Sequence, residues 1–577
     1  MNKFDRVFWK KVLSLVGLYW FSAQRRQGVK LLSWVSMLSG GAIALGAYSS
    51  YLNRDSTEAL VGKHLTQFYH LMFIWVAVTA VTVFTKVVGL YLASLLYIEW
   101  RAWLTDHFID AGFAHRAFYR MGLVGKVDNP DQRISDDISA FVASTQTFTV
   151  TLVFALAGVA TYFAILWSIS APLASILIGY ALIGTYCSVA IGRRLVGLNY
   201  YKEKYQADFR FGLVHVRDNI EPILVYGGER QEADQLRQRF SKIIANFKEL
   251  FLWQRNLGFF SESYGGVAAL VPYWFLAATY AVGRLEYGQV VQAATAFMSL
   301  HASLSIVVTS FPSLADYANV VVRLSEFLEE SKAAESDETD AREKIKVSEN
   351  SQVTLDKITV LTPDASRKLI DNVTADVSAL EPLLVQGPSG TGKTSLMRAL
   401  AGLWREGSGT VHRPRLSEVM FLPQRPYMIL GSLRDQLTYP RAVGTNDEQL
   451  LETLRKVNLP TLCERFGGLD VEMHWADVLS PGEQQRLAFA RLLLNRPRYA
   501  FLDEATSALD IGNEERMYAL LRQSRIPFLS SGHRTSLLRF HRSVLQLSPD
   551  RTWKLEQSPE FGILTTATGD GEGICRT

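Results

Sequence analysis

Six apolar stretches, each about 20 residues long, dominate the first part of this 577-residue chain. They lie at 31–52, 68–90, 146–168, 172–192, 262–282 and 288–312. A helix of about 20 residues, rising about 1.5 Å per residue, spans the hydrocarbon layer of a bilayer. Long buried helices of a soluble protein are the alternative, but six such stretches are too many for it. Because hydrophobic residues make up 48% of the chain and the mean hydropathy is +0.07, we predict a membrane protein with six spans.

The charges beside these stretches predict their orientation. The first thirty residues carry seven basic residues against one acidic residue, which places the N-terminus in the cytoplasm. We expect residues 1–28 to form an amphipathic helix along the inner membrane face, because no signal-peptide cleavage site is evident. Residues 29–328 then form the transmembrane domain, and its long charged segments 99–145 and 193–255 extend into the cytoplasm.

Composition excludes several other classes of protein. Sixty Lys and Arg against 56 Asp and Glu give a net charge of +4, which is too small to predict nucleic-acid binding. The three cysteines, Cys187, Cys463 and Cys575, are far apart in the sequence. Their spacing excludes a disulfide framework and a zinc site.

The second half of the chain has a different pattern. Residues 329–349 are polar and acid-rich and are predicted to be a linker. From residue 350 to 558, short β-type runs at 383–386, 419–422, 499–502 and 527–530 alternate with helical segments, which predicts a soluble α/β domain. The Gly- and Thr-rich residues 559–577 are expected to be a flexible tail.

A phosphate-binding loop begins directly after the apolar run 383–386. Residues 387–394 fit the pattern G-x-x-x-x-G-K-[ST]. Glycine lets backbone N–H groups approach the β-phosphate, and the helix that follows directs its positive end at the anion. Lys393 is predicted to neutralise phosphate charge and the Thr394 hydroxyl to bind Mg²⁺. The predicted nucleotide-binding residues of this loop are Gly387, Pro388, Ser389, Gly390, Thr391, Gly392, Lys393, Thr394 and Ser395.

Two acids end another apolar run, Tyr499 to Leu502. Asp503 is placed to hold Mg²⁺ through water, and Glu504 is suited to take a proton from the attacking water as a general base. A pair of solvated acids at a strand end is the plainer interpretation. It is disfavoured because the phosphate-binding loop and the motifs described next occur in the same domain.

Further motifs carry a family resemblance. The segment Leu479-Ser480-Pro481-Gly482-Glu483-Gln484-Gln485-Arg486 resembles the signature sequence of ATP-binding cassette (ABC) proteins. Gln424 in LPQRP, Asp510 in SALD and His533 in SSGHR follow the same family order. The resemblance implies ATP hydrolysis by two cassettes paired head to tail. Ser480, Gly482 and Glu483 would then face the nucleotide held by Lys393 of the partner.

The same resemblance assigns roles to three further residues. Gln424 would sense Mg²⁺ and the membrane domain, Asp510 would communicate across the dimer, and His533 would hold the γ-phosphate and position the water beside Glu504. Two positions depart from the family pattern. Pro481 replaces the commoner glycine, and the segment Val360 to Asp364 offers no aromatic ring to stack on adenine.

The membrane half narrows the resemblance. The segment 99–105 followed by 128–134, and the segment 219–229, resemble subfamily D of the ABC transporters, which includes fatty acyl-CoA and cobalamin carriers. They are also similar to the SbmA/BacA peptide-uptake permeases. Six spans and one cassette imply a half-transporter of the exporter-type (type IV) fold, working as a homodimer, with a heterodimer as the alternative. Asn129 is predicted to cap a short helix that begins at Pro130, and this helix and the segment with Glu221 and Glu229 are predicted coupling elements.

Charged or ionisable residues within the spans are candidates for the substrate cavity. These are Lys86, Glu262 and His301. For Lys86 and Glu262 the alternative is that the side chain reaches a lipid headgroup, and for His301 it is a hydrogen-bonded packing role.

Together these observations predict an ATP-driven importer of a bulky, partly hydrophilic compound such as cobalamin or a peptide, in a bacterial inner membrane. Export of acyl-CoA or lipid is one alternative. A membrane-anchored regulatory ATPase is another, which the presence of Lys393, Asp503, Glu504 and His533 disfavours.

Overall fold

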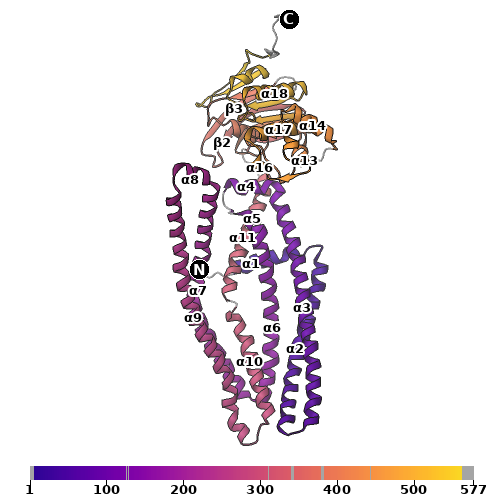
Figure 1. Ribbon diagram of the computed structural model, residues 1–577, viewed down its shortest axis with the longest axis vertical. Coiled ribbons are helices and arrows are strands. Elements are labelled where there is room, and N and C mark those ends of the chain that lie inside the picture. Colours follow the sequence, from indigo (N-terminus) through magenta and orange to yellow (C-terminus); the bar gives the residue numbers. More distant parts are fainter. Residues whose placement is uncertain are drawn as a thin grey trace. The chain divides into compact units, whose positions relative to one another are not determined.

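The computed structural model describes residues 6–124, 127, 129–309, 311–339, 344–377, 382–441 and 444–561. The chain divides into two compact units, residues 1–339 and 340–577 (Figure 1). The first is helical and the second is an α/β domain, as predicted.

Helices make up the first unit throughout its described residues. They are α1 (Arg6–Trp20), α2 (Arg25–Val61), α3 (Leu65–Phe113), the short η1 (Ala114–Arg116), α4 (Ala117–Val124), α5 (Pro130–Gln132), the π-helical turn η2 (Arg133–Asp137), α6 (Ile138–Ile169), α7 (Ala171–Asp218), α8 (Ile220–Tyr226), α9 (Glu229–Ala281), α10 (Tyr287–Thr309) and α11 (Phe311–Thr339). Among the described helices, four segments are long and apolar enough to cross a membrane: Arg25–Val61, Leu65–Gly122, Pro130–Ile169 and Ala171–Asp218. The fifth predicted span, 262–282, falls on the last part of α9. The sixth, 288–312, covers α10 and the first residues of α11, and its residue 310 lies outside the described residues.

Helix α1 is amphipathic, as its sequence predicts. Phe8, Val12, Leu15 and Tyr19 recur on one face and are buried in a cluster with residues of α3 and α11. The opposite face leaves Trp9 and Leu13 exposed. Helix α2 already begins at Arg25, so the first apolar helix starts before the predicted boundary at residue 29.

The predicted linker at 329–349 contains regular structure at both of its ends. Residues 329–339 are the last turns of α11, residues 346–349 form a strand of the second unit, and residues 340–343 lie outside the described residues. The acid-rich composition hid an amphipathic helix, because Ala334 is buried while Glu329 and Glu335 face outward. The Ser331 hydroxyl also donates to the Ala111 carbonyl oxygen of α3.

The second unit has twelve strands among its described residues, in three sheets. A four-stranded sheet, in the order β1-β5-β2-β3, is formed by β1 (Lys346–Glu349), β2 (Val353–Leu361), β3 (Lys368–Val377) and β5 (Gly407–Arg413). A six-stranded sheet, in the order β12-β11-β4-β10-β9-β6, is formed by β4 (Leu383–Gln386), β6 (Val419–Leu422), β9 (Tyr499–Asp503), β10 (Phe528–Ser531), β11 (Ser543–Leu547) and β12 (Trp553–Gln557). Strands β7 (Gly431–Ser432) and β8 (Glu472–Met473) form a small pair. The four predicted β-type runs are all strands of the six-stranded sheet.

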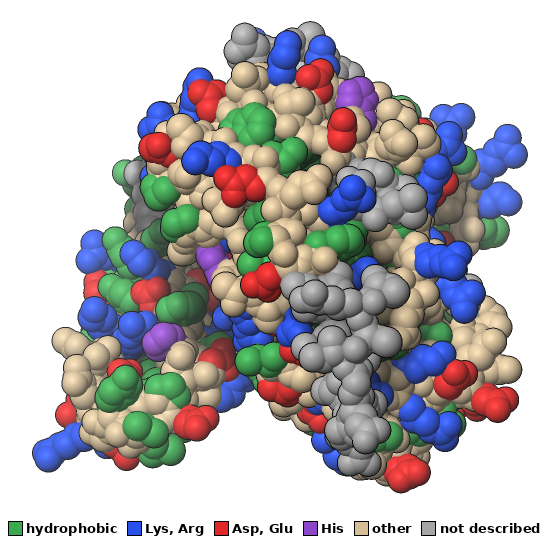
Figure 2. Space-filling model, turned by 90° about the horizontal axis from the view of Figure 1, so that it is seen from above, with side chains coloured by type: hydrophobic (Ala, Val, Ile, Leu, Met, Phe, Trp, Pro, Cys, Tyr) green, Lys and Arg blue, Asp and Glu red, His purple; other side chains and the backbone are tan. Residues whose placement is uncertain are grey.

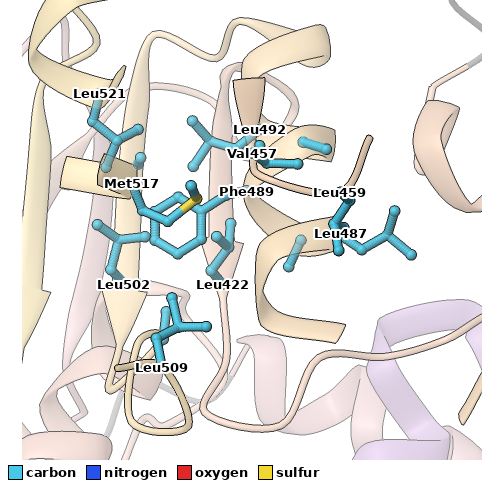
Figure 3. Packing of buried hydrophobic residues seen from close by; sticks show 14 of the residues in the cluster. Leu422, Val457, Leu459, Leu487, Phe489, Leu492, Leu502, Leu509, Met517 and Leu521 are labelled. Carbon is cyan, nitrogen blue, oxygen red and sulfur yellow. The ribbon is translucent and has the colours of Figure 1, made fainter. Parts of the chain in front are cut away.

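Helices cover and extend this sheet. They are α12 (Lys393–Leu400), η3 (Leu416–Glu418), α13 (Leu433–Thr438), α14 (Asp447–Lys456), α15 (Leu462–Arg465), α16 (Trp475–Val478), α17 (Pro481–Asn495), α18 (Ile511–Gln523) and η4 (Thr535–Phe540). Figure 3 shows how α17 and α18 pack on the strands: Phe489 and Met517 lie together beside Leu422 and Leu502. Five strands of the sheet, β11-β4-β10-β9-β6, are parallel, so the loops at their carboxyl ends share one edge.

The surface carries both signs of charge. In Figure 2, basic and acidic side chains lie interspersed over the face that is shown. Of the three cysteines, Cys187 and Cys463 are free thiols, and Cys575 lies outside the described residues. The predicted tail is described only for residues 559–561.

Candidate functional site

The phosphate-binding loop joins β4 to α12 at the carboxyl edge of the parallel strands. Gly392 precedes α12 with φ of 95°, a left-handed conformation that favours glycine. A Cβ atom at Gly392 would lie 3.2 Å from side-chain atoms of Leu369 and Ile370. One at Gly387 would lie 2.4 Å from the carbonyl oxygen of Leu547. Both glycines are therefore required by close packing as well as by the approach of a phosphate.

Lys393 begins α12 and is nearly buried, with 6% of its surface exposed. Its Nζ donates to the carbonyl oxygens of Gly387 and Pro388 at 2.9 and 3.1 Å. Burial lowers the pKa of Lys393, and the negative charges of Glu504 and Asp503 oppose that shift. The ammonium group thus lies over the loop, within the electrostatic influence of the predicted general base Glu504 and of the predicted Mg²⁺ ligand Asp503.

Glu504 brings three predicted residues together. Gln424 Nε2 donates to Glu504 Oε2 at 2.8 Å, and His533 Nε2 lies 3.3 Å from Glu504 Oε1. Gln424 follows β6, Glu504 follows β9 and His533 follows β10, and these strands are neighbours in the sheet. Parallel register therefore places the three side chains at the same edge, although 80 residues separate Gln424 from Glu504.

Glu504 is held in an unusual backbone conformation. Its φ is 46°, in the left-handed region, which costs a non-glycine residue roughly 1–2 kcal/mol. Its N–H lies 3.1 Å from Ser531 Oγ and 3.3 Å from the Ser531 carbonyl oxygen. Ser531 Oγ also donates to Asp503 Oδ1 at 2.6 Å. Ser531 therefore fixes both acids relative to β10.

The three residues predicted to bind Mg²⁺ share one cavity. Thr394, Gln424 and Asp503 line a space of about 580 Å³ beside α12. Mg²⁺ binds through one or two protein oxygens together with substrate phosphates and waters, so this sparse set of oxygen donors fits the ion. Among the described residues no group of three or more His, Cys, Asp or Glu side chains gathers as a closed metal site.

The signature segment forms a helix cap. Ser480 Oγ accepts from the Glu483 backbone N–H, and Glu483 Oε2 accepts from the backbone N–H and hydroxyl of Ser480, both at 2.9 Å. Pro481 occupies the first position of α17, where its missing N–H breaks no helical hydrogen bond. Burial raises the pKa of Glu483, but hydrogen bonds from Arg465 and Ser480 outweigh it and hold the pKa below its ordinary value. Gly482 lies close to the Ala508 carbonyl oxygen, 3.1 Å from where its Cβ would be.

Asp510 caps the next helix. Its Oδ1 accepts from the Asn513 backbone N–H at 2.9 Å, and its Oδ2 accepts from Asn513 Nδ2 at 2.7 Å. Within this chain, its contacts explain the start of α18.

Four residues that the sequence analysis did not single out brace the site. Gln485 donates to the Gln424 carbonyl oxygen and to Ser507 Oγ, both at 3.1 Å, and accepts from the Ala508 N–H at 2.9 Å. It thereby ties the signature helix to the loops after β6 and β9. Ser531, described above, is the second residue. Gln485 lies in the signature segment and Ser531 lies in the segment with His533. Their position beside predicted site residues was therefore the signal in the sequence that could have identified them.

Arg534 and Glu514 are the other two. Glu514 is buried, with 1% of its surface exposed, and accepts from Thr506, Ser536 and Arg534. Arg534 also donates to the carbonyl oxygens of Leu509 and Ser507. The residue after His533 therefore holds the loop that ends at Asp510. The sequence carries no local signal for Glu514, which looks like an ordinary acid in the first turn of a helix.

The predicted coupling residues lie in the first unit. Asn129 does not cap α5 as predicted: it has φ of 42° and makes no capping hydrogen bond from its side chain. Pro130 starts α5, but the helix continues through η2 into α6 instead of forming a separate short helix. Glu221 lies in the first turn of α8, and Glu229 is the first residue of α9.

The three candidate cavity residues are not brought together. Lys86 on α3 and Glu262 on α9 are exposed. His301 on α10 is partly buried, with its ring 4.9 Å from the ring of Tyr264. Tyr264 in turn stacks on Tyr180 at 4.3 Å between ring centroids. His301 Nε2 is buried without a hydrogen-bond partner among the described residues, so the structure shows ring packing for His301 but not the hydrogen bond expected with it.

Two family models match the chain. "ABC transporter transmembrane region 2" matches residues 19–281, and "ABC transporter" matches residues 370–507. An uncharacterized ABC transporter ATP-binding protein of Synechocystis is 40% identical over 561 residues, which cover 94% of this chain and 84% of the relative. The chain belongs to the ABC transporter family.

Two further relatives assign this ABC transporter to subfamily D. The chloroplastic ABC transporter D family member 2 of Arabidopsis thaliana is 35% identical, with 96% of this chain and 88% of the relative covered. The lysosomal cobalamin transporter ABCD4 of Homo sapiens is 30% identical, with 86% and 88% covered. The protein is thus a half-transporter, an integral membrane protein whose ATPase cassette is coupled to transport and which works as a dimer.

A solved structure supports the predicted fold of this ABC transporter. The structure of a bacterial Atm1-family ABC exporter with ATP bound matches with a TM-score of 0.72, covering 93% of this chain and 96% of that chain at 17% identity. The fold is therefore a helical exporter-type (type IV) transmembrane domain followed by an α/β cassette.

Proposed function

We propose that two copies of this chain form a homodimer that uses Mg²⁺-ATP to import a bulky, partly hydrophilic compound such as cobalamin or a peptide across a bacterial inner membrane. The observation that carries the catalytic part is the contact of Glu504 with both Gln424 and His533. Two relatives, the lysosomal cobalamin transporters ABCD4 of Mus musculus and Homo sapiens, support the substrate class. The inner membrane ABC transporter ATP-binding protein YddA of Escherichia coli, 28% identical, supports the location.

In the proposed reaction, water attacks the γ-phosphorus of ATP while the bond to the β-phosphate oxygen breaks. Glu504 takes the proton of that water, and His533 hydrogen-bonds the γ-phosphate. Mg²⁺, held by Thr394, Gln424 and Asp503, would neutralise phosphate charge. Lys393 and the N–H groups of 387–395 hold the phosphates in place, and Ser480, Gly482 and Glu483 of the partner complete the site.

The coupling elements in this proposal are the Asn129–Pro130 turn and α8 with Glu221 and Glu229. The surface of α8 supports this coupling role. Leu224, Val225 and Tyr226 are all exposed, and lipid does not account for their exposure, because α8 lies outside the predicted spans. Exposed apolar side chains on a short loop helix fit a packed contact that transmits motion.

Uptake into oriented vesicles tests the proposal. Labelled cobalamin and a proline-rich peptide are offered to right-side-out and inside-out vesicles, with wild type beside Glu504→Gln. Accumulation in right-side-out vesicles with internal ATP, lost in Glu504→Gln, is the expected result. Accumulation only in inside-out vesicles with external ATP would reverse the direction, since a shared exporter fold does not determine it. If neither compound moves while ATP hydrolysis persists, acyl-CoA or lipid export, or a regulatory role, takes its place.

A further inference from the structure

An ion-pair network joins the helix that leads to the cassette to the base of the third predicted span. Arg323 on α11 donates from Nε to Asp137 Oδ2 at 2.7 Å and from Nη2 to Asp137 Oδ1 at 2.6 Å. This two-pronged geometry fixes the angle between the groups as well as their distance. Asp137 closes the π-helical turn η2, from which α6 continues (Figure 1).

A second arginine completes the network. Arg133, at the start of the same turn, is 2% exposed and donates to the Arg323 main-chain oxygen and, at 3.3 Å, to Glu326. Arg133 and Asp137, at the two ends of the π-turn, therefore both hydrogen-bond to a single turn of α11. A π-turn contains one residue more than an α-helical turn, and such turns occur where a helix must present side chains out of its regular phase.

The surroundings of this network are apolar. Ile138, Phe141, Val321, Leu324 and Phe327 are fully buried in the same cluster. Asp137 and Arg133 are 3% and 2% exposed, whereas the side chains of Arg323 and Glu326 keep 41% and 44% of their surface exposed. Taking the Asp137 carboxylate out of water costs several kcal/mol, so the network adds little net stability. Its two-pronged hydrogen bonds instead fix the angle at which α6 and α11 meet.

The position of α11 in the chain explains why a fixed arrangement of α6 and α11 matters. Helix α11 ends at Thr339, where the first unit ends, so it is the covalent connection from the spans to the cassette. We propose that Asp137, Arg323 and Arg133 are positioning residues that transmit the movement of α11 during the ATP cycle to α6. They touch neither nucleotide nor substrate in this role.

The test compares stability, hydrolysis and movement in the full-length protein in lipid nanodiscs. The double variant Asp137→Leu/Arg323→Met removes the ion pair but keeps the site filled, and such replacements are often neutral for stability. Arg323→Lys keeps the charge and loses the two-pronged geometry. Movement is read from a cysteine at position 170, between α6 and α7, in a background where Cys187, Cys463 and Cys575 are serine. Its rate of modification by a maleimide is measured with and without ATP and orthovanadate.

In the protein that carries the cysteine at position 170 and keeps the network intact, we expect nucleotide to change the modification rate about fivefold or more. A change of this size is typical of coupling between two sites. In the double variant this change should disappear, while the unfolding temperature and the rate of ATP hydrolysis in the same nanodiscs stay close to wild type. Arg323→Lys should be intermediate. The proposal is overturned if nucleotide has no effect before the network is altered, if the double variant keeps the full change, or if it loses hydrolysis or folding together with the change.

Discussion

Gln424 donates its side-chain amide to the Glu504 carboxylate at 2.8 Å, across two neighbouring strands of the cassette sheet. The predicted general base is thus already oriented by a second predicted residue. Gln485 holds the backbone of Gln424 from the signature helix. Three motifs that are far apart in sequence meet through these two glutamines.

Removing the charge of Glu504 tests its role as the base. Glu504→Gln should lower ATP hydrolysis by about 10²- to 10⁴-fold, the range typical of a general base, with ATP affinity within a few-fold of wild type. Phosphate release and binding of a fluorescent ATP analogue would be measured on the same preparation. Glu556, exposed on β12, provides the control Glu556→Gln. Hydrolysis within a few-fold of wild type would assign the proton transfer to another group.

Truncating Gln424 tests the orientation of Glu504. Gln424→Ala should reduce the maximal hydrolysis rate by about 10- to 150-fold, since the loss of one oriented hydrogen bond to a charged group is worth about 1.5–3 kcal/mol. The steady-state rate would be measured over a range of ATP and Mg²⁺ concentrations. The exposed Gln546→Ala is the matched control. A change confined to the Mg²⁺ requirement would leave Gln424 a metal ligand only.

The buried acid Glu514 should matter for stability more than for chemistry. Glu514→Ala removes the acceptor shared by Thr506, Ser536 and Arg534, and leaving buried donors unsatisfied costs about 1–3 kcal/mol, while Arg534 keeps its bonds to the Leu509 and Ser507 carbonyl oxygens. We expect a clearly lower denaturant midpoint for the cassette. Glu448→Ala, at the exposed start of α14, should leave the midpoint unchanged. Equal midpoints for the two variants would show that the network is dispensable.

The cassette should lose stability in mild acid through His541. This side chain is fully buried against Tyr518 and Phe528, and burial lowers its pKa from 6.5 to about 4. Between pH 6.5 and about 4, His541 binds a proton in the unfolded chain but not in the folded chain. Its contribution to the free energy of unfolding is therefore fully present above pH 6.5, and about 3 kcal/mol is lost as the pH falls toward 4.

Unfolding midpoints at pH 7.5 and 4.5 would be compared for wild type and His541→Gln. The variant should have a lower midpoint at pH 7.5 but a smaller loss between the two values. Identical losses would mean that other groups cause the acid sensitivity.

Base selectivity should be low. The loop Thr362 to Arg367 offers no ring to stack on adenine, and the indole N–H of Trp404 is occupied by the Leu361 carbonyl oxygen. We expect GTP and ATP to be hydrolysed with kcat/KM values within about tenfold of each other, which corresponds to less than about 1.4 kcal/mol of discrimination. Pro363→Tyr should increase the preference for ATP, and Pro363→Ala is its control. A strong preference for ATP in the wild type would reveal another contact to the base.

Sequence patterns predicted the cassette better than the membrane half. The strands at 383–386 and 419–422 were located to the residue, because short apolar runs between motifs leave few alternatives. The family resemblance predicted that His533 lies beside Glu504, whereas the contact of Gln424 with Glu504 was not predicted and results from the parallel register of β6 and β9. Glu514 was missed because its burial results from tertiary packing, which its neighbours in sequence do not signal.

One local expectation failed, and one local detail was not predicted. The type of residue at Asn129 predicts a helix cap, whereas its backbone is left-handed and its side chain makes no capping bond. Acidic composition predicts a linker at 329–349, and the boundary between the two units lies within it, but composition does not show that one face of residues 329–339 packs on the bundle and is helical to Thr339. Composition averages over the two faces of a helix and conceals such a pattern.

Because residues 329–339 are helical, a residue inserted there changes the direction of the chain as well as its length. A flexible tether absorbs an inserted residue as extra length. In an α-helix each inserted residue advances the chain by about 1.5 Å and turns the rest of that helix by about 100°. Insertions of about seven or eleven residues nearly restore the original direction, whereas one or two residues do not. An insertion before Ala334 should therefore keep this residue on the buried face of α11 only when its length matches the helical repeat.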